Sequence, residues 1–339
     1  MGKTIFRAFL ISAVALSAYT STEALAEKVT IRIASFLPER SSTVRGMFKP
    51  WIAGVKKELG DAIEIKEFWG GALGRAPKKQ FDHAVDGVAD MTAVVPGYTP
   101  GRFGGYSVHD LPFMIKSGVE GSIAQWRMFK AGHFTGFEKV KMMGIFITAP
   151  YKIHTKKPFK TVAGLKGMKI RTAGTVQAAT IKSMGAVPIG IPLSQATEAL
   201  SRGVLDGVLL GYAAVGVFKM STIATYHYIP ALSAGTVVAV MNKQKWESLP
   251  AKVKAVMDKY GGETMAATAG AQIDKVEKTF YGKMKASKKH HFIPASPELS
   301  KKGQAAFQPL YDKWIKENKN GQKIFDDYVR IIKEIRAGK

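Results

Sequence analysis

The hydrophobic and polar positions in the first part of the chain alternate between strand-like and helix-like spacing. Residues 29–33 (Val-Thr-Ile-Arg-Ile) alternate apolar and polar side chains, which predicts a strand. Across residues 44–59 the apolar side chains recur every three or four positions, which predicts an amphipathic helix. Pro50 is expected to bend this helix or delay its start. Further strands are expected at 63–68 and 91–95, with a short helix between them. This order is typical of a parallel α/β sheet.

The same order returns later in the chain. Residues 168–171, 188–191 and 204–210 are predicted to be strands, separated by helices at 176–183 and 195–202. Ligands of such sheets bind beyond the carboxyl ends of the strands. Because the two stretches have matching order, we expect two similar α/β lobes.

A short repeat supports the prediction of two similar lobes. Chance is the alternative explanation for so brief a match. The sequence Gly-Val-Ala-Asp at 87–90 returns as Gly-Val-Leu-Asp at 203–206, each time between a predicted helix and an apolar run. A glycine past a helix end adopts the left-handed conformation easily. Beyond these units we expect a strand at 236–241 and a long helix from Pro250 to about residue 286, long enough to brace both lobes. Two more amphipathic helices follow.

The first 26 residues have the pattern of a secretory signal peptide. Lys3 and Arg7 precede an apolar run at 8–18, and the segment ends in the small-residue sequence Ala-Leu-Ala at 24–26. The run is too short to cross a bilayer core of roughly 30 Å, although an uncleaved membrane anchor is the alternative. We therefore expect cleavage after Ala26 and export of the mature protein to the periplasm.

Composition narrows the chemistry of the exported protein. The chain has no cysteine, which excludes disulfides, thiol catalysis and cysteine-ligated metal. Its 50 basic and 26 acidic side chains give a formal net charge of +24, which favours the capture of anions. The basic residues are spread along the chain and no nucleic-acid motif is present, so nucleic acid is not the expected partner.

Motifs for catalysis and metal binding are also missing. The glycine-rich segment 70–74 lacks the spacing of a phosphate-binding loop, and no Gly-x-Ser-x-Gly sequence occurs. His290 and His291 are adjacent, so their side chains point apart and make a poor metal pair. We expect no enzymatic activity, no cofactor and no metal.

An ordered set of short motifs resembles the solute-binding proteins of TRAP (tripartite ATP-independent periplasmic) transporters, the DctP-like family. Each motif is weak alone, but their order and spacing hold from about residue 29 to residue 250. The motifs lie at residues 71–74, 87–91, 111–113, 164–171, 184–188 and 198–207.

The resemblance implies a two-lobed α/β periplasmic binding protein fold, with a ligand cleft between the lobes and a long helix spanning both. It implies a first lobe of residues 27–149 plus about 236–275, and a second of 150–235 plus about 276–339. It also implies a small organic acid as the ligand, delivery to the membrane subunits of a TRAP transporter, and a monomer. A sensor for a signalling partner, or service to another transporter class, is the alternative.

The same resemblance places a carboxylate-binding arginine at Arg171, at the end of the predicted strand 168–171. Arginine suits this role because its planar fork donates two parallel hydrogen bonds to a carboxylate and stays charged. Lys152 is a second candidate cation, with a solvated surface lysine as the alternative.

The positions around the predicted cleft are mostly apolar where some relatives have polar residues. An apolar pocket with one or two charged groups predicts a monocarboxylate with an aromatic, branched or longer aliphatic body. Packing inside or between the lobes is the alternative for each residue. The candidates for the wall are Phe36, Val95, Leu193, Leu210 and Tyr212. The candidates for closing over the ligand are Trp69, Tyr98 and Tyr151.

Overall fold

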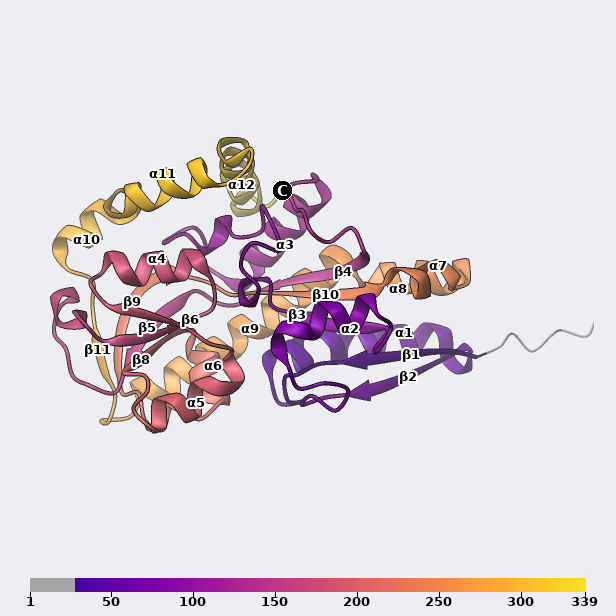
Figure 1. The fold of residues 1–339 in the computed structure, drawn as a ribbon, viewed down its shortest axis with the longest axis horizontal. Coiled ribbons are helices and arrows are strands. Elements are labelled where there is room, and N and C mark those ends of the chain that lie inside the picture. Colours follow the sequence, from indigo (N-terminus) through magenta and orange to yellow (C-terminus); the bar gives the residue numbers. More distant parts are fainter. Residues whose placement is uncertain (1–27) are drawn as a thin grey trace, which may run out of the picture.

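The computed structural model describes residues 28–339, which form two α/β lobes that stand side by side in Figure 1. The predicted signal peptide and its cleavage site after Ala26 lie outside the described residues. Across residues 28–339, no helix combines the length and apolar character needed to cross a membrane. Each lobe is a sheet with helices packed on it, as the alternation of strands and helices predicts.

The first lobe is built on a five-stranded sheet with strand order β2-β1-β3-β10-β4. β1 runs parallel to β2 and β3, whereas β10 is antiparallel to β3 and β4. Four of these strands confirm the sequence prediction within a few residues, and β4 is additional. The strands are β1 (Val29–Ala34), β2 (Ile63–Phe68), β3 (Met91–Val94), β4 (Val140–Ile147) and β10 (Thr236–Asn242).

The second lobe has a six-stranded sheet with strand order β11-β9-β5-β8-β6-β7. β6 is parallel to β7 and β8, and β5 is antiparallel to β8 and β9. The predicted strands correspond to β6, β7 and β8, whereas β5, β9 and β11 were not predicted. The strands are β5 (Tyr151–Thr155), β6 (Lys169–Thr172), β7 (Val187–Gly190), β8 (Gly207–Leu210), β9 (Tyr226–Ser233) and β11 (His291–Ile293).

Two short crossovers, residues 148–150 and 234–235, connect the lobes. They are bonded to each other, because Thr148 N donates to Gly235 O and Gly235 N donates to Thr148 Oγ1, both at 2.9 Å. A side chain at Gly235 has no room, since its Cβ would stand 2.2 Å from the hydroxyl of Tyr151. The crossovers therefore run together as a single hinge.

The helices cover the outer faces of both sheets. Pro50 lies in the first turn of α1, which continues directly from a π-helical turn at Val44–Phe48, so the expected delay of the regular helix is confirmed. The helices are α1 (Lys49–Leu59), α2 (Gln80–Val85), α3 (Gly118–Lys130), α4 (Thr175–Ser183), α5 (Leu193–Ser201), α6 (Tyr212–Val217), α7 (Lys243–Ser248), α8 (Ala251–Tyr260), α9 (Gly262–Lys285), α10 (Pro297–Lys302), α11 (Gln308–Glu317) and α12 (Gly321–Arg336).

The long helix predicted from Pro250 to about residue 286 is divided in two, so the prediction of one continuous helix is wrong. α8 ends before Gly261 and α9 begins at Gly262, which takes a φ of 57°. A Cβ at Gly262 would also stand 2.9 Å from the ring of Trp126, so only glycine fits this turn. With 24 residues, α9 is about 36 Å long and packs against α3 and β4 of one lobe and α6 of the other.

Two carboxylates on α9, one turn apart, each bind the start of a helix from a different lobe. Asp274 accepts hydrogen bonds from Gly118 N (2.7 Å) and Val119 N (3.1 Å) at the start of α3. Glu277 accepts one from Ala213 N (2.8 Å) at the start of α6. Helix starts carry unpaired N–H groups and partial positive charge, so both contacts are favourable. α9 thus ties the two lobes together behind the hinge.

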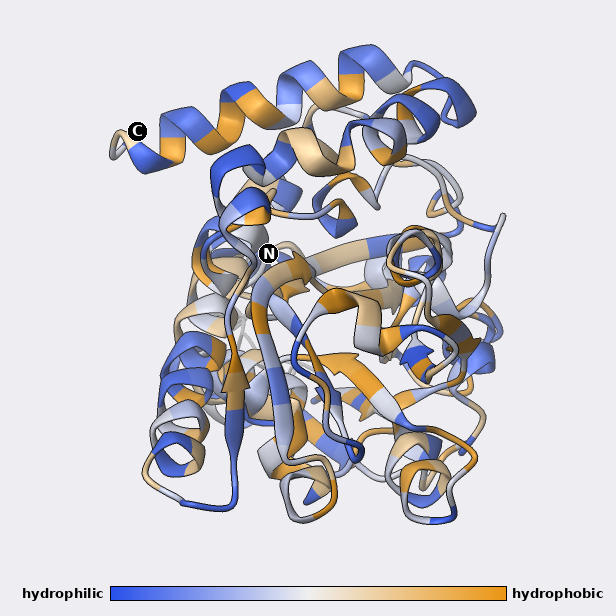
Figure 2. Ribbon diagram, turned by 90° about the vertical axis from the view of Figure 1, so that its left-hand side faces the viewer, coloured by the Kyte–Doolittle hydropathy of each residue, from blue (hydrophilic) through white to orange (hydrophobic). Residues whose placement is uncertain are grey.

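The last helix, α12, packs against α3 of the first lobe, although the sequence assignment placed residues 276–339 with the second lobe. Figure 2 shows alternating hydrophilic and hydrophobic bands along this C-terminal helix, which is typical of an amphipathic helix with one buried face. Tyr328 and Ile331 on that face are buried. The C-terminal helices therefore reach across both lobes, since α11 packs against α4 of the second lobe.

Three histidines form a hydrogen-bonded chain through the second sheet. His154 Nε2 bonds to Leu210 O (3.0 Å), His154 Nδ1 lies 2.7 Å from His227 Nδ1, and His227 Nε2 lies 2.8 Å from His290 Nδ1. Burial lowers the pKa of His154 well below its usual value and lowers the pKa of His227 to about 3. No group of three or more metal-binding side chains with ligating geometry is found in the described part of the chain.

The histidine chain predicts a loss of stability in mild acid. His154 and His227 stay neutral in the folded protein but take up protons on unfolding below pH ~6.5, so stability falls as pH drops from there. The slope is expected to reach about 1.4 kcal/mol per pH unit for each histidine. Urea unfolding at pH 7.5, 6 and 5 measures it. His227→Phe should flatten the dependence of stability on pH, whereas His291→Gln, at an exposed position, should not. Equal slopes in the wild type and both variants would show that the histidine chain does not cause the loss of stability.

Candidate ligand-binding cleft

A cleft between the two lobes collects residues from the carboxyl ends of strands in both sheets. Phe36 and Val95 follow β1 and β3 of the first lobe, and Ala173 follows β6 of the second. The empty space between the walls, including the part open to solvent, measures about 760 Å³.

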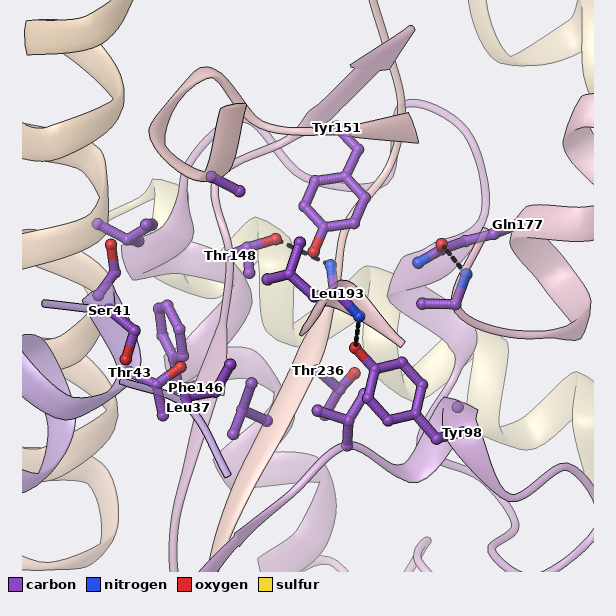
Figure 3. Close-up of a pocket in the computed structure, with 18 of the residues that line it drawn as sticks. Leu37, Ser41, Thr43, Tyr98, Phe146, Thr148, Tyr151, Gln177, Leu193 and Thr236 are labelled. Carbon is purple, nitrogen blue, oxygen red and sulfur yellow. Dashed lines mark hydrogen bonds between the residues drawn. The ribbon is translucent and has the colours of Figure 1, made fainter. Parts of the chain in front are cut away.

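The walls of the cleft are mainly apolar and aromatic. The rings of Phe36 and Tyr98 meet edge to face with their centroids 6.2 Å apart. Figure 3 shows Tyr98, Tyr151 and Leu193 around the opening. The apolar lining residues are Phe36, Leu37, Val95, Phe146, Leu193, Ala214, Val217, Phe218, Val237 and Ile273. Polar groups are few, and the side chains that supply them are Ser41, Ser42, Thr43, Tyr98, Tyr106, Asp110, Thr148, Tyr151, Gln177 and Thr236.

Arg171 lies on β6 beside this cleft, with only 1% of its surface exposed. Its Nε donates to Ile191 O (2.9 Å) and its Nη2 to the hydroxyl of Tyr98 (3.2 Å). Among residues 28–339 no carboxylate lies within 4.0 Å of the guanidinium, and Nη1 makes no hydrogen bond. Burying a charge without a counter-charge is costly. The arrangement therefore favours binding of an anion.

Tyr98 contacts Arg171 at the cleft and links the two lobes. Its hydroxyl oxygen accepts hydrogen bonds from Arg171 Nη2 (3.2 Å) and from Leu193 N (2.9 Å), both in the second lobe. Both lone pairs of this oxygen are used, so its own proton remains to be donated to a ligand. The neighbouring Gly97 touches the same lobe, because a Cβ there would stand 2.0 Å from Ala173 O.

Tyr151, the first residue of β5, supplies a second phenol to the cleft. Burial raises the pKa of Tyr151 to about 12, while the charge of Arg171 lowers it and the charge of Asp110 raises it further. The phenol therefore stays protonated at neutral pH and can donate a hydrogen bond. Because both charges act on Tyr151, Arg171 and Asp110 both lie near this part of the cleft.

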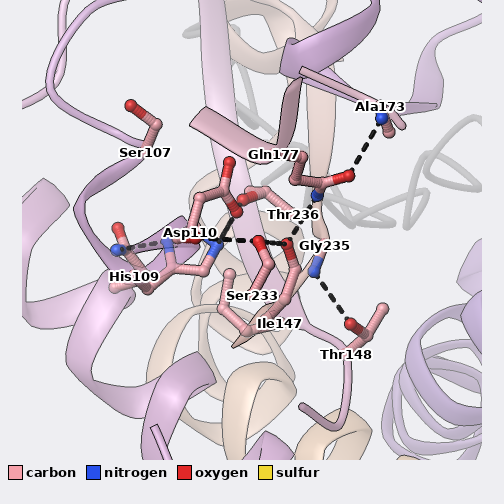
Figure 4. A network of polar contacts seen from close by, with 12 residues as sticks. Ser107, His109, Asp110, Ile147, Thr148, Ala173, Gln177, Ser233, Gly235 and Thr236 are labelled. Atoms are coloured by element: carbon pink, nitrogen blue, oxygen red, sulfur yellow. Dashed lines mark hydrogen bonds and ion pairs between the residues drawn. The ribbon is translucent and has the colours of Figure 1, made fainter. Parts of the chain in front are cut away.

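Gln177 connects the strand that carries Arg171 to the hinge. Its Oε1 accepts from Ala173 N (2.9 Å) and its Nε2 donates to Ala234 O (2.8 Å), as Figure 4 shows. Nearby, the hydroxyl of Ser233 donates to Asp110 O (2.8 Å). Polar contacts therefore join the second-lobe wall, the hinge and the loop before Leu111 into one network.

The structure brings five of the predicted wall and lid residues to the cleft, namely Phe36, Val95, Leu193, Tyr98 and Tyr151. Three other predicted residues lie elsewhere. Leu210 is fully buried in the core of the second lobe, and Tyr212 packs on His154 and Tyr281. Trp69 packs on Phe48.

Lys152 also lies outside the cleft. Successive side chains on a strand point to opposite faces, so Tyr151 faces the cleft and Lys152 faces away from it. Lys152 Nζ donates to Pro150 O (2.7 Å) and Glu277 Oε1 (3.0 Å), next to α9. Its charge is paired inside the protein and does not face Arg171.

Sequence reasoning missed Asp110, Gln177 and the aromatic residues Phe146 and Phe218. Asp110 directly precedes the Leu-Pro-Phe motif at 111–113 and lines the cleft. Its position beside a recognised motif is the sequence signal that could have identified it. The other three belong to elements in which no pattern distinguishes a residue facing the cleft from one facing the core.

Comparisons with known proteins identify relatives that share this fold. A TRAP solute-binding protein from Rhodoferax ferrireducens T118, solved with copurified benzoate, is 28% identical with a TM-score of 0.83, covering 92% of this chain and 100% of that one. A marine metagenome TRAP solute-binding protein specific for aromatic acid ligands, co-crystallized with 3-hydroxybenzoate, is 29% identical with a TM-score of 0.85, covering 91% and 98%.

Among curated proteins, the outer membrane transporter protein TsaT of Comamonas testosteroni is 26% identical over 315 residues, covering 89% of this chain and 91% of that protein. The family model described as "Bacterial extracellular solute-binding protein, family 7" matches residues 33–318. The resemblance to TRAP solute-binding proteins is thereby confirmed, and the chain belongs to family 7 of the bacterial extracellular solute-binding proteins.

Proposed function

We propose that this protein captures a monocarboxylic acid with an aromatic body in the periplasm and delivers it to the membrane subunits of a TRAP transporter. The observation that carries the proposal is Arg171, a buried guanidinium without a counter-charge beside a mostly apolar cleft. Two solved relatives at 28% and 29% identity hold benzoate and 3-hydroxybenzoate, which supports an aromatic acid as the ligand. We assign the cleft a binding role and no catalytic one.

Binding of the acid follows from the donors around Arg171. The carboxylate takes the unused N–H groups of Arg171 together with the hydroxyl protons of Tyr98 and Tyr151, while the ring lies against Phe36 and Leu193. Because Tyr98 stands on the first lobe and Arg171 on the second, closing the lobes assembles the donors and removes water. Hydrogen bonds to the carboxylate are stronger in such a dry site than in water.

A thermal-shift screen of the mature chain, beginning at Glu27, tests the proposal. Aromatic monocarboxylates are expected to raise the melting temperature, because a ligand at 100 times its Kd adds about 2.7 kcal/mol of stability. Sugars, amines and metal ions are the comparison set. If only these compounds raise the melting temperature and no carboxylic acid does, the assignment of the ligand as an organic acid is refuted.

Tyr98→Phe is expected to weaken binding of the acid by roughly tenfold to a hundredfold. The change removes the acceptor of Arg171 Nη2 and Leu193 N and one donor to the carboxylate, and such hydrogen bonds are worth about 1–3 kcal/mol each. Isothermal titration calorimetry measures the change in Kd. Tyr106→Phe is the matched control, since Tyr106 lines the same cleft without bonding to Arg171. Equal Kd values for the two variants would contradict the role of Tyr98.

A further inference from the structure

One acidic side chain, Asp110, lies among the residues that line the cleft. It ends the short helical turn Val108–Asp110, and only 4% of its surface is exposed. Its Oδ1 is fully buried and makes no hydrogen bond of good geometry with any described residue. A buried carboxylate oxygen without a well-formed hydrogen bond is uncommon in folded proteins and points to a functional demand on this position.

Within residues 28–339, the ion contact of Oδ1 is with the neighbouring imidazole. His109 Nε2 lies 3.1 Å from Asp110 Oδ1, but the same nitrogen lies 2.8 Å from Thr236 Oγ1. His109 Nδ1 lies 2.7 Å from the side-chain amide of Gln125, so the imidazole has several partners and Asp110 is only one of them. Figure 4 shows His109, Asp110 and Thr236 close together. One shared N–H leaves most of the acceptor capacity of the carboxylate unused.

No arginine or lysine in the described part of the chain pairs with Asp110 across the cleft. A Cβ on Gly174, in the second lobe, would stand 4.0 Å from Asp110 Oδ2, so this oxygen lies at the gap between the lobes. Arg171 reaches the same cleft through its hydrogen bond to Tyr98, and the charges of both Arg171 and Asp110 act on Tyr151. A ligand whose carboxylate is held at Arg171 therefore has this acceptor within the same cleft.

We propose that Asp110 accepts a hydrogen bond from a hydroxyl group on the ligand, so that the protein selects a hydroxylated aromatic monocarboxylate. This inference rests on the proposed function and names the substrate class of the same site. A hydroxyl donates one proton, which matches a single carboxylate in an otherwise apolar wall. An ammonium group needs three acceptors, and Asp110 is the only carboxylate among the lining residues.

Asp110 also excludes a second carboxylate on the ligand. A dicarboxylate with one group at Arg171 would place its other charge near a buried anion, and like charges repel strongly where water is absent. The pair of Arg171 and Asp110 therefore gives the cleft one positive and one negative end.

The test compares matched ligands by isothermal titration calorimetry on the mature protein. Benzoate and phenylacetate are the parent acids, and their 2-, 3- and 4-hydroxy derivatives supply the hydroxyl at different places. Isophthalate supplies a second carboxylate, and 3-(aminomethyl)benzoate supplies an ammonium group. Each ligand is measured with the wild type, Asp110→Asn, Asp110→Ala and the exposed control Asp61→Asn.

In the wild type and in Asp61→Asn, one hydroxylated acid is expected to bind about tenfold or more tightly than its parent. Asp110→Ala should reduce that ratio to about one, and Asp110→Asn should raise the affinity for isophthalate by about tenfold or more. A merely structural role of Asp110 would weaken all acids alike. The inference fails if no hydroxylated acid exceeds its parent, if the ammonium ligand binds best, or if Asp110→Ala leaves the ratio unchanged.

The wild-type comparison needs no variant, so the inference stays testable even where a substitution prevents folding. Failure of the proposed function gives a different result, because then neither the parent acids nor their hydroxy derivatives bind. Parent acids that bind through Arg171 without any preference for a hydroxyl overturn the role of Asp110 alone.

Discussion

Arg171→Ala is expected to raise the Kd of the bound acid by roughly thirty-fold to several-thousand-fold. Removing one partner of a buried, hydrogen-bonded charge pair costs about 2–5 kcal/mol, and each 1.4 kcal/mol is a factor of ten. Arg171→Lys should fall between the wild type and alanine, because lysine keeps the charge but loses the planar fork. Isothermal titration calorimetry with an acid found in the thermal-shift screen gives all three values.

The contribution of Arg171 to folding can be distinguished from its contribution to binding by measurements on the ligand-free protein. Because the guanidinium is buried without a counter-charge, Arg171→Met, which keeps most of the side-chain volume, is expected to leave the melting temperature of the ligand-free protein nearly unchanged. Arg202→Ala, on the exposed end of α5, serves as the control for nonspecific loss of positive charge. If Arg171→Ala binds the acid as tightly as the wild type does, the site has been assigned to the wrong residue.

Much of the fold follows from hydrophobic spacing, and the exceptions have physical causes. β1 was predictable because its apolar and polar residues alternate, and β6 and β8 because each lies next to a helix with clear periodicity. β9 was not, since its sequence Tyr-His-Tyr-Ile-Pro-Ala-Leu-Ser combines a buried histidine with a proline and follows neither period. β11 has three residues and depends on pairing with β9, which local sequence does not reveal.

The cleft residues also differ in whether a sequence pattern predicts them. Phe36 and Val95 were predictable because each follows the carboxyl end of a strand, where ligands of parallel sheets bind. Leu210 is the last residue of β8 and is buried in the core, and Tyr212 at the start of α6 packs on His154 and Tyr281, although the later residues of α6 line the cleft. Asp110 was missed because a single buried carboxylate leaves no periodic signal in the sequence.

The adjacency of Tyr151 and Lys152 carried information that sequence reasoning left unused. Neighbours on a strand point to opposite faces, so both side chains could not line the same cleft. Sequence alone could not decide which of them faces the ligand, because the partner of Lys152 is Glu277 on α9, 125 positions further along the chain.

Glu277→Ala is expected to lower the free energy of unfolding by about 3–5 kcal/mol, the usual cost of breaking a buried ion pair from one side. Lys152 and Glu277 are only 15% and 12% exposed, with Nζ and Oε1 3.0 Å apart. Alanine would leave the Lys152 charge without its partner and the N–H of Ala213 at the start of α6 without its acceptor. Denaturant unfolding with the double variant Lys152→Met/Glu277→Leu should recover much of the loss, because a well-packed apolar pair replaces two buried charges.

The matched control is Glu198→Ala, which breaks the exposed pair of Arg202 and Glu198 and should cost less than about 1 kcal/mol. Glu277 differs from Glu198 because it joins α9, β5 and α6, whereas Asp274 one turn earlier joins α9 to α3. Removing the Glu277 contacts therefore frees the second lobe from the helix that braces it against the first. An unfolding free energy for Glu277→Ala no lower than that of Glu198→Ala would show that α9 does not hold the lobes together through this carboxylate.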